Sequence, residues 1–149
     1  MYRTTKNSRS NSMPTKAQER FSKKKEPKKV LLEKDFAGIK KGQWMFVGTP
    51  QIVADYIKRI PFGETRTIER MRRELARRRK CDASCPVSTA IFIRVAAQAA
   101  IDDIEDGVAP AATTPFWRLI NSEDKIAKKL TIDSAWIDNQ REIEAVSSA

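Results

Sequence analysis

The sequence predicts a mainly α-helical fold with a small β wing: a winged helix-turn-helix domain preceded by a disordered basic tail. Three observations predict it. A capping threonine or a helix-opening proline precedes each of three stretches of apolar residues, one of these helices carries a cationic face, and an apolar segment followed by turn residues comes after the longest helix. At 149 residues the chain has length for one domain and a tail. We expect a tail over 1–29, a transitional segment over 30–48 and the domain over 49–145.

The tail is predicted to be disordered because it is rich in Ser, Asn, Thr, Lys and Arg and has almost no large apolar residues. The chain carries a net charge of +10. Most of this charge lies in residues 1–45, which include the tail and hold 13 Lys/Arg against 4 Asp/Glu. A Lys-rich stretch of this kind attracts polyanions, although a solvated linker has the same composition. The candidate phosphate contacts are Lys23, Lys24, Lys25, Lys28 and Lys29. In the transitional segment, Trp44, Phe46 and Val47 predict a short extended piece that docks on the domain.

A first helix is expected to begin at Thr49, because a capping hydroxyl is followed by Pro50, whose missing N–H costs nothing at the first helical position. Its core face is predicted from helical spacing, and residues 61–63 end it with a turn. That face comprises Ile52, Val53, Tyr56 and Ile57.

Thr67 is expected to cap a second helix over 68–80, with Ile68, Met71 and Leu75 as its buried stripe. The opposite side is a cationic ridge about 15 Å long. We predict that this ridge binds a polyanion, because an ordinary solvated face mixes charges and only Glu69 and Glu74 relieve this one. The ridge comprises Arg70, Arg73, Arg77 and Lys80, and Arg66 precedes it.

A third helix is predicted from Pro86 to about Asp106, with Gly107 as its stop. Apolar side chains cover most of its circumference, so it should be buried. Only its first turn, with Ser88 and Thr89, would contact a ligand, as the start of a recognition helix does, and its free N–H groups suit a phosphate. Arg94 and Gln98 lie together on one side.

After a loop over 108–115, residues 116–120 read as a strand, 121–124 as a turn and 125–126 as a returning strand. We expect this pair to form the wing. Residues 133–145 are predicted to close the domain as a helix, with Ala135, Trp136 and Ile137 facing inward.

The residue types restrict the chemistry. The chain has no histidine, so the commonest general base and metal ligand are missing. Cys81 and Cys85 alone cannot close a tetrahedral zinc site, and we expect free thiols, no metal and no cofactor. The sequence contains no run of about 18 apolar residues and no signal-peptide pattern. We therefore expect no membrane span, a monomer, and a cytoplasmic location (nucleoid-associated if the protein is bacterial).

Two motifs resemble a known family. Ile60-Pro61-Phe62-Gly63-Glu64-Thr65-Arg66-Thr67 is similar to the I-P-x-G-x-x-x-T-Y segment of the alkylguanine-DNA alkyltransferases. Thr114-Pro115-Phe116-Trp117-Arg118-Leu119-Ile120 falls where those enzymes carry I-P-C-H-R-V-V. The resemblance covers about residues 46–145 and is closer to the non-enzymatic alkyltransferase-like proteins. It implies a DNA-binding winged helix-turn-helix, and Arg118 as a retained family residue in the interface.

The departures from the family pattern matter for mechanism. The alkyl-accepting cysteine falls on Phe116 and its activating histidine on Trp117, so we expect no enzyme activity of this kind. The nucleotide-flipping tyrosine falls on Ile68. Residues 87–93 contain no arginine to fill a gap in the duplex, and Arg94 is the nearest substitute. Phe116 and Trp117 could stack on an unstacked base, but core packing is favoured because aromatic side chains tend to be buried.

The sequence thus predicts a non-enzymatic protein that binds duplex DNA, damaged DNA included, with DNA favoured over RNA. Two alternatives stay open. A ribosome- or RNA-associated protein would use the same cations, because phosphate contacts do not distinguish the polymers. An adaptor would recruit a protein through the acidic end of the third helix, at Asp102, Asp103, Glu105 and Asp106.

Overall fold

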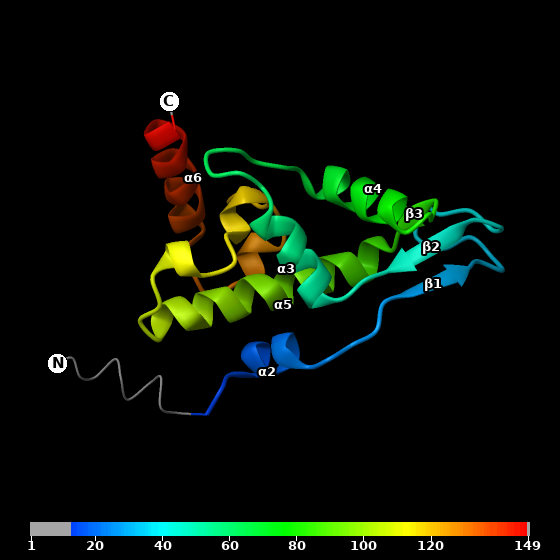
Figure 1. Cartoon of the computed structure of the whole chain (residues 1–149), viewed down its shortest axis with the longest axis horizontal. Helices are drawn as coiled ribbons and strands as arrows, with labels where there is room; N and C mark the ends of the chain where they lie inside the picture. The colour runs from blue at the N-terminus through cyan, green and yellow to red at the C-terminus, as the bar shows by residue number, and fades with distance from the viewer. Residues whose placement is uncertain (1–12, 149) are drawn as a thin grey trace.

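A computed structural model describes residues 13–148 and shows a mainly helical protein with a small sheet at one end (Figure 1). Three single turns of 3-10 helix join the last elements. The elements in chain order are α2 (Lys16–Ser22), β1 (Lys28–Leu31), β2 (Trp44–Val47), α3 (Pro50–Lys58), α4 (Ile68–Arg78), β3 (Ala83–Ser84), α5 (Pro86–Glu105), η1 (Pro110–Ala112), η2 (Phe116–Arg118), η3 (Ala127–Lys129) and α6 (Ser134–Ser148).

The predicted helix ends are confirmed where local capping decides them. The Thr49 hydroxyl accepts a hydrogen bond from the Ile52 N–H at 3.1 Å and opens α3. The Thr67 hydroxyl accepts from the Arg70 N–H at 3.0 Å and opens α4, which ends two residues earlier than predicted. Gly107 follows α5 with a left-handed φ of 102°, as a helix stop requires.

Helix α5 lies in the middle of the protein, between α3 and α2 (Figure 1). Its buried side chains include Ile93, Ala97 and Ile101, and they pack with residues of α3, α4 and the segment around η2. The prediction that this helix is buried is therefore confirmed. Helix α6 confirms the closing helix, and Ile137 faces inward as expected. Trp136 is half-buried and packs inward against Phe116 and Trp117, as expected, whereas Ala135 is exposed.

The sheet has the order β1-β2-β3. Strand β1 pairs antiparallel with β2, with Leu31 opposite Trp44 and Lys29 opposite Phe46, and β3 pairs parallel with β2. The extended piece expected at residues 44–47 is thus strand β2. In Figure 1 the β1–β2 hairpin projects beyond the helices at one end of the molecule.

The predicted wing over 116–126 is wrong. Residues 116–118 form a turn of 3-10 helix, in which the Arg118 N–H donates to the Pro115 carbonyl at 2.9 Å. Phe116, Trp117 and Ile120 are all buried. A strand would point Phe116 and Trp117 to opposite faces, whereas a coiled backbone turns both into the core.

The predicted disorder of residues 1–29 is wrong for the part that the structure describes; residues 1–12 lie outside it. Helix α2 forms over 16–22 and starts with a capping box between Thr15 and Gln18. Two side-chain hydrogen bonds hold it against α5: Thr15 to Asp102, and Gln18 Nε2 to Asp103 Oδ1 at 2.8 Å. No helix within residues 13–148 is long and apolar enough to cross a membrane.

Candidate nucleic-acid interface

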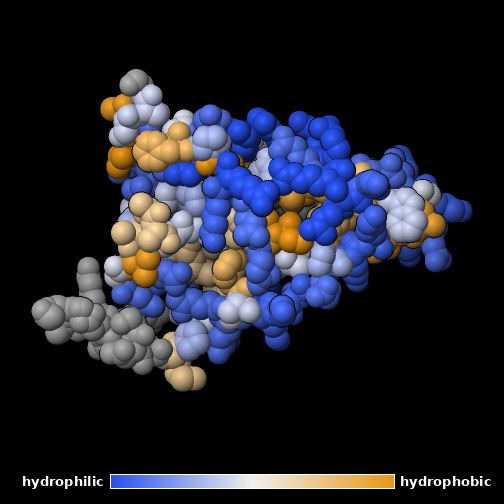
Figure 2. Space-filling view, in the orientation of Figure 1, coloured by the Kyte–Doolittle hydropathy of each residue, from blue (hydrophilic) through white to orange (hydrophobic). Residues whose placement is uncertain are grey.

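Of the cationic ridge predicted on the second helix, Arg73 and Arg77 lie on the exposed side of α4. Lys80 lies two residues beyond the end of the helix, where its backbone has a left-handed φ of 56°. Arg73, Arg77 and Lys80 are exposed, and none of the three has an ion-pair partner among residues 13–148. Figure 2 shows the most hydrophilic side chains gathered over α4, along the upper edge of the molecule. These three cations are free to meet a polyanion.

The other two arginines expected here are already engaged. Arg70 Nε lies 2.8 Å from Glu74 Oε2, and Arg66 Nη1 lies 2.9 Å from Glu64 Oε1. Glu74 also accepts a hydrogen bond from the Tyr56 hydroxyl at 2.6 Å. These bonds, from Arg70 first and then from Tyr56, hold the pKa of Glu74 below its ordinary value. Arg66 and Arg70 therefore contribute less net positive charge than the sequence suggests.

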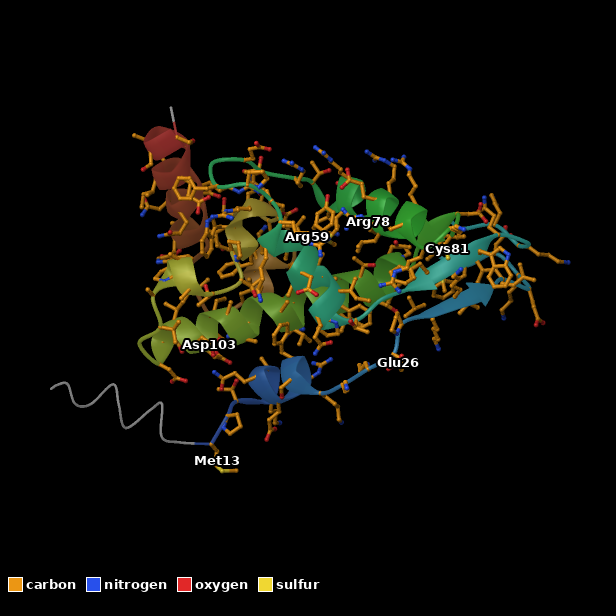
Figure 3. The ribbon with its side chains drawn as sticks, viewed as in Figure 1. Met13, Glu26, Arg59, Arg78, Cys81 and Asp103 are labelled. Atoms are coloured by element: carbon orange, nitrogen blue, oxygen red, sulfur yellow. The ribbon has the colours of Figure 1, made fainter. Side chains whose placement is uncertain are left out.

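Three further cations that the sequence patterns did not point to, Arg59, Arg78 and Arg79, line a hollow of about 200 Å³ between α3 and α4, together with Asp55. The Arg78 guanidinium lies 5.4 Å from the centre of the Tyr56 ring, and that of Arg79 lies 5.0 Å from the Phe46 ring. Hydrophobic atoms are visible in this hollow in Figure 2, and Figure 3 labels Arg59 and Arg78 on its two sides. Stacking on an aromatic ring leaves the guanidinium N–H groups available, so these residues extend the cationic surface of α4.

The first turn of α5 offers less than predicted. The Thr89 hydroxyl is buried and donates to the Cys85 carbonyl at 2.6 Å, so Thr89 is a helix-internal residue and not a contact. A threonine hydroxyl in a helix commonly bonds to the carbonyl four residues earlier. The Ser88 side chain is half-buried, and the backbone N–H of Ser88 donates to Cys85 Sγ at 3.4 Å. Arg94 is exposed. The Thr67 hydroxyl is exposed but serves as the cap of α4.

Arg118 is a structural residue and not an exposed contact. Its Nε and Nη2 lie 2.9 and 3.0 Å from the two carboxylate oxygens of Glu144, and its Nη1 donates to the Ile60 carbonyl at 2.9 Å. Glu144 is only 6% exposed and also accepts from Trp117 Nε1 at 2.8 Å. Burial alone would raise the pKa of Glu144, but the hydrogen bonds from Arg118 and Trp117 hold it below its ordinary value.

The alternative of base stacking by Phe116 and Trp117 is contradicted by their position. The two rings are 0% and 2% exposed and meet edge to face, with centroids 5.3 Å apart. Trp136 packs against both. No face of either ring is open to a nucleobase, so the favoured interpretation, core packing, is confirmed.

The candidate tail lysines are exposed but do not form one surface with the ridge. Lys23, Lys24 and Lys25 directly follow α2, which lies on the opposite side of α5 from α4 in Figure 1, whereas Lys28 and Lys29 belong to strand β1. The ammonium of Lys25 lies 5.6 Å from the centre of the Phe92 ring of α5. Gln51 at the start of α3 donates a hydrogen bond to the Lys23 carbonyl at 3.2 Å, which fixes the course of this segment. Lys29 lies opposite Phe46 of β2, whose ring contacts the Arg79 guanidinium at the end of α4.

Residues at the start of α2 already form hydrogen bonds with part of the acidic end of α5. Asp102 is buried, accepts from Thr15 and from Gln98 Nε2 (the latter at 3.0 Å), and Asp103 accepts from Gln18. Figure 3 shows Asp103 at the end of α5 that faces α2. An adaptor partner could use both carboxylates only by displacing α2.

No family model, no curated protein and no solved structure matches this chain. Both cysteines are free thiols, with Cys85 buried and Cys81 half-buried. Burial raises the pKa of the Cys81 thiol, which opposes use of this residue as a nucleophile. Within residues 13–148, no three potential metal ligands among His, Cys, Asp and Glu lie together.

Proposed function

We propose that the protein is a non-enzymatic DNA-binding protein of the alkyltransferase-like type, in which α4, β3 and α5 form the helix-turn-helix. The observation that carries this proposal is the free cationic surface over α4. Arg73 and Arg77 are exposed on the helix and Lys80 just after it, and Arg59, Arg78 and Arg79 continue the positive charge toward α3. Segregated charge of this kind produces a local positive field that attracts a polyanion.

We propose that no alkyl transfer occurs, because the two residues at the positions of the family's acceptor cysteine and activating histidine lack the chemistry of those residues. Phe116 has no nucleophilic atom, and Trp117 cannot act as a base. The Trp117 indole N–H is moreover committed to Glu144. Neither residue can therefore accept an alkyl group or act as the activating base.

A salt series tests the proposal. We expect the log of the affinity for a fluorescent 20-base-pair duplex to fall linearly with the log of the salt concentration, by about 0.9 for each neutralised phosphate. Replacing Arg73, Arg77 and Lys80 together with Ala should lower the magnitude of that slope by up to about 2.7 if each meets one phosphate. The measurement is fluorescence anisotropy on the full chain.

The matched control is the triple variant at Lys125, Lys128 and Lys129, which removes the same charge from exposed positions around η3. This variant should keep the wild-type slope. Equal effects of the two triple variants, or an affinity that is independent of salt, would overturn the proposal. The experiment is completed with alkylated duplex and structured RNA as competitors. Tighter binding of RNA would identify RNA as the polymer that the protein binds. A preference for the alkylated duplex would support the alkyltransferase-like assignment.

A further inference from the structure

The β1–β2 hairpin with its connecting loop, residues 28–47, has an unusual surface for an edge of a small sheet; we call it the arm. Three large hydrophobic side chains are exposed on it: Leu31 at 49%, Phe36 at 43% and Trp44 at 44%. The same segment holds five lysines, at positions 28, 29, 34, 40 and 41, against Glu33 and Asp35, and Lys40 lies 3.8 Å from the Asp35 carboxylate. Exposed aromatic groups among cations are typical of surfaces that bind nucleic-acid strands.

Hydrogen bonds fix Trp44 next to the end of α4. The Trp44 N–H donates to Asp82 Oδ2 at 2.7 Å, and the Asp82 N–H donates to the Trp44 carbonyl at 2.9 Å. Asp82 lies two residues after Lys80, the last cation of the ridge. The strand carrying Trp44 is thereby held beside the C-terminal end of the cationic surface.

The sheet register determines which side chains share a face with Trp44. Alternate residues of a strand point to the same side, so Trp44 shares its face with Phe46, and Leu31 lies directly opposite Trp44 on that face. Arg79 covers the Phe46 ring at 5.0 Å on that side. Lys29, opposite Phe46, is on the same face. The exposed indole of Trp44 thus shares a sheet face with Lys29 and with the Phe46 ring that Arg79 covers.

We propose that Trp44 is a stacking platform for an unpaired nucleobase, on a nucleic acid whose phosphates lie along α4. This inference rests on the proposed function and adds a second part to the ligand, a single-stranded or extruded nucleotide beside a duplex. Paired bases inside a duplex offer no open face to an indole, whereas an overhang or an extruded base does. The lysines of the arm favour this ligand over a protein partner, because lysine is depleted in the cores of protein–protein interfaces.

The test uses three probes on the same duplex: a blunt end, a five-nucleotide overhang, and the same overhang built from abasic nucleotides. The last two carry equal numbers of phosphates and differ only in the bases. We expect the wild-type chain to bind the normal overhang about ten-fold more tightly than the abasic one. Trp44→Ala should remove this preference and leave the affinity for the blunt duplex unchanged, whereas Trp44→Phe should retain most of it.

Fluorescence provides an independent readout. Trp117 is buried and Trp136 half-buried, so Trp44 is the indole most accessible to a base. The normal overhang should quench wild-type emission, and Trp44→Phe should abolish that quenching. Circular dichroism and the unchanged blunt-duplex affinity verify that the variants are folded.

The outcomes separate the two proposals. Salt-dependent binding of the blunt duplex, with no preference of the wild type for bases over abasic nucleotides, would overturn the Trp44 inference and leave the proposed function standing. Absence of binding to every probe would overturn both. A change in oligomeric state on Trp44→Ala, without an effect on the overhang preference, would identify the arm as a self-association surface and would also overturn the inference.

Discussion

Replacement of Arg118 by Ala should destabilise the fold without weakening nucleic-acid binding by the folded protein. The substitution removes both bonds from Arg118 to Glu144 and the bond to the Ile60 carbonyl. Glu144 would keep the Trp117 indole and a long 3.4 Å bond from the Gly63 N–H. Breaking one partner of a buried pair costs about 3–5 kcal/mol, because the remaining charge is left without compensation. The Arg118 side chain is 15% exposed, so we expect the lower end of this range.

Thermal and urea unfolding measure this loss. A destabilisation of about 3 kcal/mol in a domain of this size lowers the Tm by roughly 10 °C. The matched control is Arg73→Ala, at an exposed cation of the ridge, which should change stability by less than about 0.5 kcal/mol while it weakens binding of the duplex. A Tm within 2 °C of wild type for Arg118→Ala, together with a loss of affinity equal to that of Arg73→Ala, would refute the reasoning.

The pH dependence of the stability follows from the same pair, Arg118 and Glu144. Because the folded pKa of Glu144 is below its ordinary value, its contribution to stability is complete above about pH 4.5 and is lost as the pH falls through the folded pKa. Glu144→Gln should therefore be less stable than wild type at pH 7. The difference in Tm between the two should shrink as the pH is lowered from 5 to 3; a constant difference would contradict the assignment.

Three further outcomes are expected. Gly63→Ala should lose more stability in urea than Gly42→Ala: both glycines have a left-handed φ (86° and 89°), but only at Gly63 would the added Cβ collide with the Ser148 side chain. Ala at both Thr15 and Gln18 should release α2, so that limited trypsin digestion cuts after Lys16 and Arg20 much faster, with little change in Tm. Tyr56→Phe should remove an ionisation near pH 12 from the ultraviolet titration, since burial and then Glu74 raise the pKa of that phenol to about 12.

The elements that sequence analysis placed correctly depend on neighbouring residues. Thr49 and Thr67 cap their helices through bonds that span three residues, and Gly107 supplies the left-handed stop of α5. Such signals are complete within a short stretch of sequence. The apolar circumference of α5 likewise predicted its burial without knowledge of what would cover it.

The elements that it missed depend on partners far along the chain. Helix α2 is held by bonds from Thr15 to Asp102 and from Gln18 to Asp103, across more than 80 residues. Composition alone predicts disorder for such a segment. Arg118 is a similar case, because its partner Glu144 lies 26 residues later on another helix. The sequence alone does not distinguish an arginine whose N–H groups form hydrogen bonds within the protein from one whose N–H groups are available to a ligand.

This distinction relocates the candidate interface. Once Arg118, Arg66 and Arg70 are recognised as paired, and Thr89 as internal, the free cations concentrate in the second half of α4. That half ends beside the arm, and the Cys85 N–H at the start of α5 donates to the Phe46 carbonyl of β2 at 2.9 Å. The end of α4, strand β2 and the start of α5 are therefore one connected unit. A nucleic acid drawn to Arg77 and Lys80 would meet Trp44 at the same end of the molecule, so the salt slope and the base preference should report on one binding event.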